Sequence, residues 1–141
     1  MPVFIWWQRY FISKFDASGN FVWVRQIGGP SNDGGMSLAS DGSGNVYITG
    51  YFQGTVNFDP GQGYILISTG VNDDIFICKL DDSGNFFWVK QIGGLPITSI
   101  DFYYGGKSLV VDTSGDVYIT GSFAGTVDFD PGTGTYYLTS T

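Results

Sequence analysis

The amino-acid sequence contains an internal duplication, which strongly limits the folds that it can adopt. Residues 41–61 (DGSGNVYITGYFQGTVNFDPG) and 112–132 (DTSGDVYITGSFAGTVDFDPG) are identical at 16 of 21 positions. Residues 15–29 and 80–94 are identical at 11 of 15 positions. The offset is 71 residues for the first pair and 65 for the second, because the second copy has a connection that is six residues longer. A unit that recurs within one chain indicates an architecture of stacked repeats.

Four turns in the two copies share the pattern Asp-x-Ser-Gly-Asn, with Asp in place of the final Asn in one of them. They lie at residues 16–20, 41–45, 81–85 and 112–116. The first Asp can accept a hydrogen bond from the backbone N–H two residues later, and the Gly can adopt a positive φ. Runs rich in Val, Ile, Tyr and Phe flank the turns, so each turn predicts a β-hairpin.

The hairpins predict four strands in each repeat, denoted A to D. Strand A covers residues 36–40 and 107–111, strand B 46–52 and 117–123, strand C 10–15 and 75–80, and strand D 21–27 and 86–92. Between B and C, two further pairs of segments have strand character: 55–58 with 64–68, and 126–129 with 136–140. Strands A to D, joined by short turns, predict a four-stranded antiparallel sheet. Copies of such a sheet commonly bury both faces by stacking radially.

The composition agrees with an all-β chain and excludes several kinds of site. There are 22 Gly and 13 Asp but no Glu, three Ala and six Leu, so strong helix formers are scarce. The absence of His excludes Ser-His-Asp triads and His metal sites. The single cysteine, Cys78, can form neither an internal disulfide nor a thiolate zinc site.

Acidic residues are the remaining candidates for acid–base or metal chemistry. Carboxylates are paired at residues 73–74, 81–82, and 128 with 130. Their spacing fits no EF-hand calcium loop, and nothing in the sequence places two of them across a cleft as a glycosidase requires. We therefore expect no enzyme activity, no metal and no cofactor.

The charge balance argues against two kinds of partner. The net charge is −7 at pH 7 with six Lys and Arg residues. A protein that binds the nucleic-acid backbone or an anionic membrane needs a basic surface, so we expect neither partner. No apolar run approaches the ~20 residues that span a bilayer. Residues 1–9 are apolar but lack a basic region and a small-residue cleavage site, so we expect no signal peptide, and the cellular location stays open.

Several segments resemble a known repeat family. The blocks DGSGNVYITG and DTSGDVYITG, the FDPG that follows each, and DDIFICKLDDSGNFFWVKQIGG are similar to the bacterial SBBP-type β-propeller repeat. The resemblance covers nearly the whole chain after about Arg9 and occurs twice. It implies a β-propeller fold and, in many cases, extracellular or cell-surface bacterial parents, but no shared catalytic residues. Two departures stand out: family members usually carry many repeats, and Gln8-Arg9 stands where the second repeat has Asp73-Asp74.

The order of the strands predicts an assembly. Residues 1–29 hold strands C and D of a shared blade, residues 33–94 a complete four-stranded blade, and residues 105–141 strands A and B of a shared blade. Two blades are too few to close a ring, so we expect a homo-oligomer in which the last A–B pairs with the first C–D of the next copy. A trimer with six blades is favoured over a tetramer with eight. Trp6 and Trp7 could seal the contact between chains or anchor a ligand.

The duplicated strand D offers the candidate binding residues. Trp23 and Trp88 occupy equivalent positions and could form a stacking platform for sugar rings, or they could pack between sheets. Gln26 and Gln91 follow them and could orient a polar ligand or satisfy backbone groups. The sequence therefore predicts a non-enzymatic propeller scaffold that assembles with itself, with a carbohydrate-binding, lectin-like propeller as the alternative.

Overall fold

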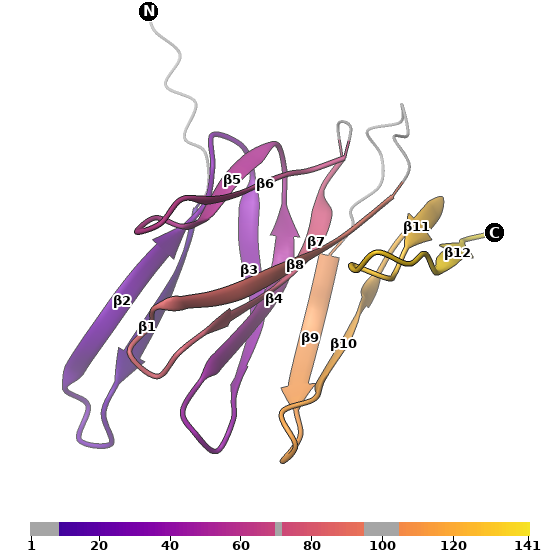
Figure 1. Cartoon of the computed structure of the whole chain (residues 1–141). Coiled ribbons are helices and arrows are strands. Elements are labelled where there is room, and N and C mark those ends of the chain that lie inside the picture. Colours follow the sequence, from indigo (N-terminus) through magenta and orange to yellow (C-terminus); the bar gives the residue numbers. More distant parts are fainter. Residues whose placement is uncertain (1–8, 70–71, 95–104) are drawn as a thin grey trace, which may run out of the picture.

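The computed structural model describes residues 9–69, 72–94 and 105–141, and all regular secondary structure in these ranges is β-strand (Figure 1). The strands are β1 (Tyr10–Phe15), β2 (Phe21–Ile27), β3 (Asp33–Ser40), β4 (Val46–Phe52), β5 (Thr55–Asp59), β6 (Tyr64–Ile67), β7 (Asp74–Leu80), β8 (Phe86–Gly94), β9 (Gly105–Val111), β10 (Val117–Ser122), β11 (Thr126–Asp128) and β12 (Tyr137–Thr139). The expected all-β fold is confirmed. None of these residues forms a helix with the length and hydropathy of a membrane span. Trp6 and Trp7 lie outside the described residues.

The predicted strand limits agree with the observed ones to within three residues. Among the differences, β3 begins at Asp33 rather than at residue 36, and β8 continues to Gly94 rather than ending at residue 92. Both extensions consist largely of glycines, and a glycine carries no side chain that could show the alternating pattern of a strand.

A central sheet contains six strands in the order β12-β11-β8-β7-β4-β3, and all neighbouring pairs are antiparallel. Strands A to D of the middle repeat are β3, β4, β7 and β8, which are adjacent in the predicted order. The sheet has six strands rather than the predicted four because β11 pairs with the end of β8, with Val127 opposite Gly94 and Asp128 opposite Gly93. Glycines at this end of β8 allow the second backbone to approach closely.

Two hairpins flank the central strands on opposite sides. The β1–β2 hairpin and the β9–β10 hairpin are separate two-stranded sheets, as is β5–β6 (Figure 1). Within the described residues no sheet closes on itself, and β1 and β10 each keep one unpaired edge. The fold therefore presents an open strand edge at each side of the molecule.

The four Asp-x-Ser-Gly turns form as predicted. In each turn the Asp Oδ1 atom accepts hydrogen bonds from the backbone N–H groups two and four residues later. The glycines have φ values of +82°, +82°, +76° and +88° at Gly19, Gly44, Gly84 and Gly115. Hydrogen bonds from the Asn that ends the turn lower the pKa values of Asp16, Asp41 and Asp81.

We expect Asp41→Ala to lower the free energy of unfolding, because several donors lose their acceptor. Those donors are the backbone N–H groups of Ser43 and Asn45, the Asn45 Nδ2 atom and the Tyr47 hydroxyl. Urea unfolding followed by circular dichroism measures the change. Ser43→Ala in the same turn is the control and should change stability by less than about 0.5 kcal/mol.

The apolar core lies between the flanking hairpins and the central sheet, which we call the units of the fold, rather than within one sheet. One cluster joins the β1–β2 hairpin to the central sheet, and we call this contact the first inter-unit interface. A smaller cluster joins the other face of β7 and β8 to β10, β11 and Phe129, and we call it the second inter-unit interface. Packing between neighbouring units therefore holds the fold together.

Candidate functional site

Aromatic rings form the centre of the first inter-unit interface. Tyr10 of β1 stacks on Phe76 of β7, with ring centroids 5.4 Å apart and an interplanar angle of 16°. Phe76 also contacts Phe58 at 5.1 Å and Phe52 at 6.5 Å. All four side chains are buried, and Phe76 is 0% exposed. Phe76 thus acts as a knob from the central sheet that enters a pocket built partly by the neighbouring unit.

Polar contacts fasten the edge of this interface. The Trp23 Nε1 atom donates to the backbone oxygen of Asp82 at 3.0 Å, and the Arg25 Nε atom donates to that of Gly84 at 2.7 Å. A Cβ atom added at Gly84 would lie 2.8 Å from the Trp23 ring, so the turn lies directly against the indole. Lys14 forms an ion pair with Asp82. The strand-D tryptophan of one unit therefore packs under the C–D turn of the next unit.

The four predicted ligand-binding residues occupy different surroundings. Trp23 is 7% exposed. Trp88 is partly exposed, and its ring contacts that of Tyr47 edge to face, with the ring centroids 6.2 Å apart. Gln91 donates through Nε2 to the Ile67 backbone oxygen and to the Asp74 carboxylate, whereas Gln26 is exposed. Each tryptophan is an odd number of residues from its glutamine, so the two project from opposite faces of their strand. A glycan-binding role for the four stays a prediction.

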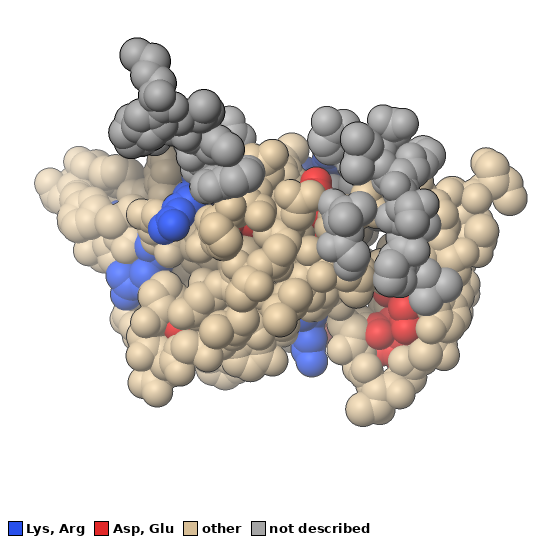
Figure 2. All heavy atoms as spheres, turned by 90° about the horizontal axis from the view of Figure 1, so that it is seen from above, with Lys and Arg blue, Asp and Glu red and all other residues tan. Residues whose placement is uncertain are grey.

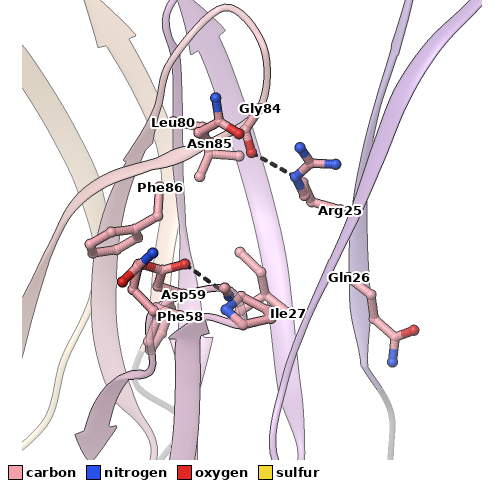
Figure 3. Close-up of a pocket in the computed structure, with 12 residues that line it drawn as sticks. Arg25, Gln26, Ile27, Phe58, Asp59, Leu80, Gly84, Asn85 and Phe86 are labelled. Carbon is pink, nitrogen blue, oxygen red and sulfur yellow. Dashed lines mark hydrogen bonds between the residues drawn. The ribbon is translucent and has the colours of Figure 1, made fainter.

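A cavity of about 440 Å³ lies beside Trp23 in the first inter-unit interface, between β2, the β5–β6 turn and the β7–β8 turn (Figure 3). Three of its polar side chains are already paired: Arg25 with Gly84, Asn85 with Asp81, and Asp59 with the N–H of Gly61. Figure 3 shows that the Gln26 side chain points away from the other lining residues. These three side chains therefore stabilise the turns that surround the cavity.

A second cavity, of about 300 Å³, lies in the second inter-unit interface. It is apolar, and its lining includes Ile75, Ile77, Ile119, Phe123 and Phe129. Phe123 and Phe129 contact each other edge to face with centroids 5.1 Å apart. The second interface, like the first, is lined by apolar side chains that include aromatic rings. Its centre, however, is a cavity, whereas Phe76 occupies the centre of the first interface.

Equivalent positions of the two repeats differ sharply in exposure. Three residues on the outer units are exposed although their counterparts in the central sheet are buried: Phe11 at 73% against Phe76 at 0%, Phe15 at 58% against Leu80 at 2%, and Tyr118 at 58% against Tyr47 at 2%. Val24 is likewise exposed and Val89 buried, whereas at the other edge of the repeat Leu38 of the central sheet is exposed and Leu109 of β9 is buried. Large apolar side chains gathered on one surface mark contact sites. A neighbouring unit covers the equivalent faces in the middle of the molecule, and no unit covers these faces at its ends.

Charge differs between the two ends of the molecule. The β1–β2 end carries Arg9, Lys14 and Arg25 with one carboxylate, whereas residues 105–139 carry four carboxylates and one lysine. Seen from above, basic side chains gather over β1 and β2, and an acidic patch lies over the side of β9 to β12 (Figure 2). Opposite potentials on two surfaces favour their association. The two open ends are therefore electrostatically complementary.

Three carboxyl groups lie close together near the start of β7. Asp33 accepts hydrogen bonds from the N–H groups of Gly29 and Gln53, and Asp74 accepts them from Thr69 and Gln91. Burial raises the pKa of both groups. Burial, together with the charges of Asp33 and Asp74, raises the pKa of Asp73 to about 6, although Lys107 opposes the shift. These groups bind protons more tightly in the folded chain than in the unfolded chain.

We expect the free energy of unfolding to be higher at pH 5 than at pH 7.5. The raised pKa of Asp73 contributes stability at low pH that is lost as the pH rises through about 6, whereas the lowered pKa of Asp81 contributes stability that is lost as the pH falls below about 4. After allowance for partial solvent exposure, Asp73 accounts for about 1 kcal/mol between pH 5 and 7.5. Urea titrations at both pH values measure the difference. Asp73→Asn should reduce it, and an equal difference in that variant would contradict the assignment.

Sequence reasoning named the carboxylates at residues 73–74 but missed their burial beside Asp33, and it missed the apolar cavity. The residue types were visible, but no local pattern shows which Asp a neighbouring strand will bury. Among the described residues, no three His, Cys, Asp or Glu side chains are grouped so that they could hold a metal ion.

The fold and these interfaces define a class of protein, a β-strand repeat scaffold in which each unit packs on the next. Residues 22–51 match the family model described as the SBBP β-propeller repeat. The resemblance to this repeat is therefore confirmed over these residues.

Two relatives are similar over most of this chain. An uncharacterized WD repeat-containing protein, L264, of Acanthamoeba polyphaga mimivirus is 30% identical over an alignment of 116 residues that covers 72% of this chain and 8% of that protein. The regulatory protein FlaEY of Caulobacter vibrioides is 29% identical over an alignment of 104 residues that covers 67% of this chain and 11% of that protein. The chain thus spans only a small part of the length of these relatives.

Proposed function

We propose that this chain is a non-enzymatic β-propeller scaffold that assembles head to tail with further copies of itself. The observation that carries the proposal is the contrast between Phe11, 73% exposed, and its counterpart Phe76, 0% exposed. A large apolar side chain kept in water at one copy of a repeat and buried at the other is explained if a further unit covers the first position.

A second copy of this chain has the features that the open ends require. In a contact between two copies, the β9–β10 hairpin of one copy lies beside the β1–β2 hairpin of the other. The free edge of β10 then pairs with the free edge of β1, so one contact satisfies both unpaired edges. Its acidic end meets the basic end of its neighbour. Such a contact joins two different surfaces, so it continues from copy to copy until a ring closes. We favour a ring of three copies over a ring of four.

Amide hydrogen exchange tests the proposal. In the assembled protein, the outward-facing amides of β1 and β10 should be protected to a degree similar to those of β4 and β7, and protection should grow with protein concentration. The free edge of β3 is the internal control, because β3 ends the central sheet and stays unpaired in the proposed assembly. Exchange of β1 and β10 as fast as that of the β3 edge at every concentration would contradict self-assembly.

A further inference from the structure

We infer that Phe11 of one copy fills the apolar cavity in the second inter-unit interface of another copy, while β1 pairs with β10 in the register of β7 with β4. The inference rests on the proposed self-assembly and specifies how the two surfaces meet. It follows from placing the contacts of the first interface on the equivalent residues of the second.

The cavity reproduces the surroundings of Phe76. Phe11 is the counterpart of Phe76 at the repeat offset of 65 residues. The residues that contact Phe76 have counterparts in the cavity wall: Ile75 for Tyr10, Phe123 for Phe52 and Phe129 for Phe58. Gly50, whose Cβ would lie 3.0 Å from the Phe76 ring, corresponds to Gly121, which also lines the cavity. Only the central ring is absent from this arrangement, and an exposed Phe11 lies at the opposite end of the same chain.

The size and polarity of the cavity suit a phenyl ring. Its volume is about 300 Å³, and its wall consists mainly of Ile and Phe side chains. An apolar cavity of roughly 150 Å³ already binds benzene in another protein. The remaining space suits the neighbours of Phe11 on the same strand face, because Phe15 corresponds to Leu80 of the first interface.

The intact sheet fixes the register of the pairing. In the central sheet, Ile48 lies opposite Cys78. The equivalent pair between copies is Ile119 opposite Ser13. A shift by one residue would turn Phe11 to the other face of β1, away from the cavity. Only an even register therefore allows the ring to enter, and the observed pairing of β4 with β7 selects one of them.

A second contact from the same hairpin supports this placement. The turn at residues 81–85 packs on Trp23 in the first interface, so the turn at residues 16–20 of the second copy should pack on Trp88. Trp88 is partly exposed, as expected if its covering turn comes from another copy. Ala17 stands where the first interface has Asp82, so the contact between copies lacks the ion pair that Lys14 makes within the chain.

Disulfide cross-linking tests the register. The variant that combines Ser13→Cys with Ile119→Cys places two thiols at directly opposite positions of neighbouring copies, within reach of a disulfide. The two positions lie on the two flanking hairpins of one chain, so the expected bond joins different copies. Cys78 is buried and burial raises its thiol pKa to about 12, so it should not compete. Ser13→Cys with Val117→Cys is the matched control, because it keeps both thiols on the same face but two residues out of register.

We expect mild oxidation of the first variant to give a ladder of covalent oligomers on a non-reducing gel that ends at the ring size, with at least tenfold less cross-linking in the control. Stronger cross-linking in the control would overturn the register. An oligomer by light scattering without cross-links in the first variant would overturn the fit of Phe11 to the cavity but leave self-assembly standing. A single-chain mass at all concentrations would overturn both.

Discussion

The Phe11→Ala variant should remain folded and should lose most of its self-association. In a single chain the Phe11 ring is 73% exposed, so its removal costs the isolated fold little. In the assembly the ring would be buried as Phe76 is, and burial of a Phe side chain contributes about 1.5–3 kcal/mol. The dissociation constant of each contact between copies should therefore rise by roughly tenfold to a hundredfold.

Sedimentation velocity at micromolar concentration measures this effect, with circular dichroism as the check of folding. Phe87→Ala is the matched control, because Phe87 and its counterpart Val22 are both exposed although the first interface is formed. The control should sediment as the native chain does. If Phe11→Ala associates as strongly as the control, the ring does not lie in a contact between copies.

The same substitution at the equivalent position of the central sheet, Phe76→Ala, should lower the stability of the single chain. Phe76→Ala removes a ring that is fully buried against Tyr10, Phe52 and Phe58, and it leaves a cavity in the first interface. Such changes lower the free energy of unfolding by about 3–5 kcal/mol. A large part of the stability of an ordinary domain would be lost.

Urea unfolding of the two variants, followed by tryptophan fluorescence, compares the two positions directly. Trp23 packs in the first interface and reports its loss. The measurement belongs at concentrations low enough to exclude association. Equal destabilisation by Phe11→Ala and Phe76→Ala would show that the two copies of the repeat have the same surroundings within one chain, which contradicts the asymmetry described above.

The sequence predicted the local structure well because local chemistry determines it. The Asp and Gly of each Asp-x-Ser-Gly turn have specific tasks, which are to accept backbone hydrogen bonds and to adopt positive φ, and both are visible in the residue types. Runs rich in Val, Ile, Tyr and Phe beside the turns then predicted strands such as β4 and β7 close to their observed places.

The long-range pairing was harder to predict. The contact of β11 with the end of β8 joins Val127 to Gly94, and Gly94 offers no side chain that could indicate a partner. The early start of β3 at Asp33 has a similar cause, because Gly34 and Gly35 show no pattern. Pairing at such positions depends on how the backbones meet in space.

The candidate site shows the same division. Repetition identified Trp23 and Trp88 as equivalent, but only the structure shows that the turn at Gly84 covers the Trp23 indole. The apolar cavity is also invisible in the sequence, because it is a gap defined by residues from β7, β8 and β10 and by the segment around Phe129. Comparison of Phe76 with its counterpart Phe11 suggested the side chain that we propose for this cavity.

Static light scattering of the unmodified chain tests self-assembly most directly. A closed ring of three copies has a mass of about 46 kDa, against 15.3 kDa for one chain. We expect the larger mass throughout the micromolar range, with dissociation toward the single chain on dilution. A mass of 15.3 kDa at every concentration, from a protein whose circular dichroism shows the all-β fold, would contradict the account.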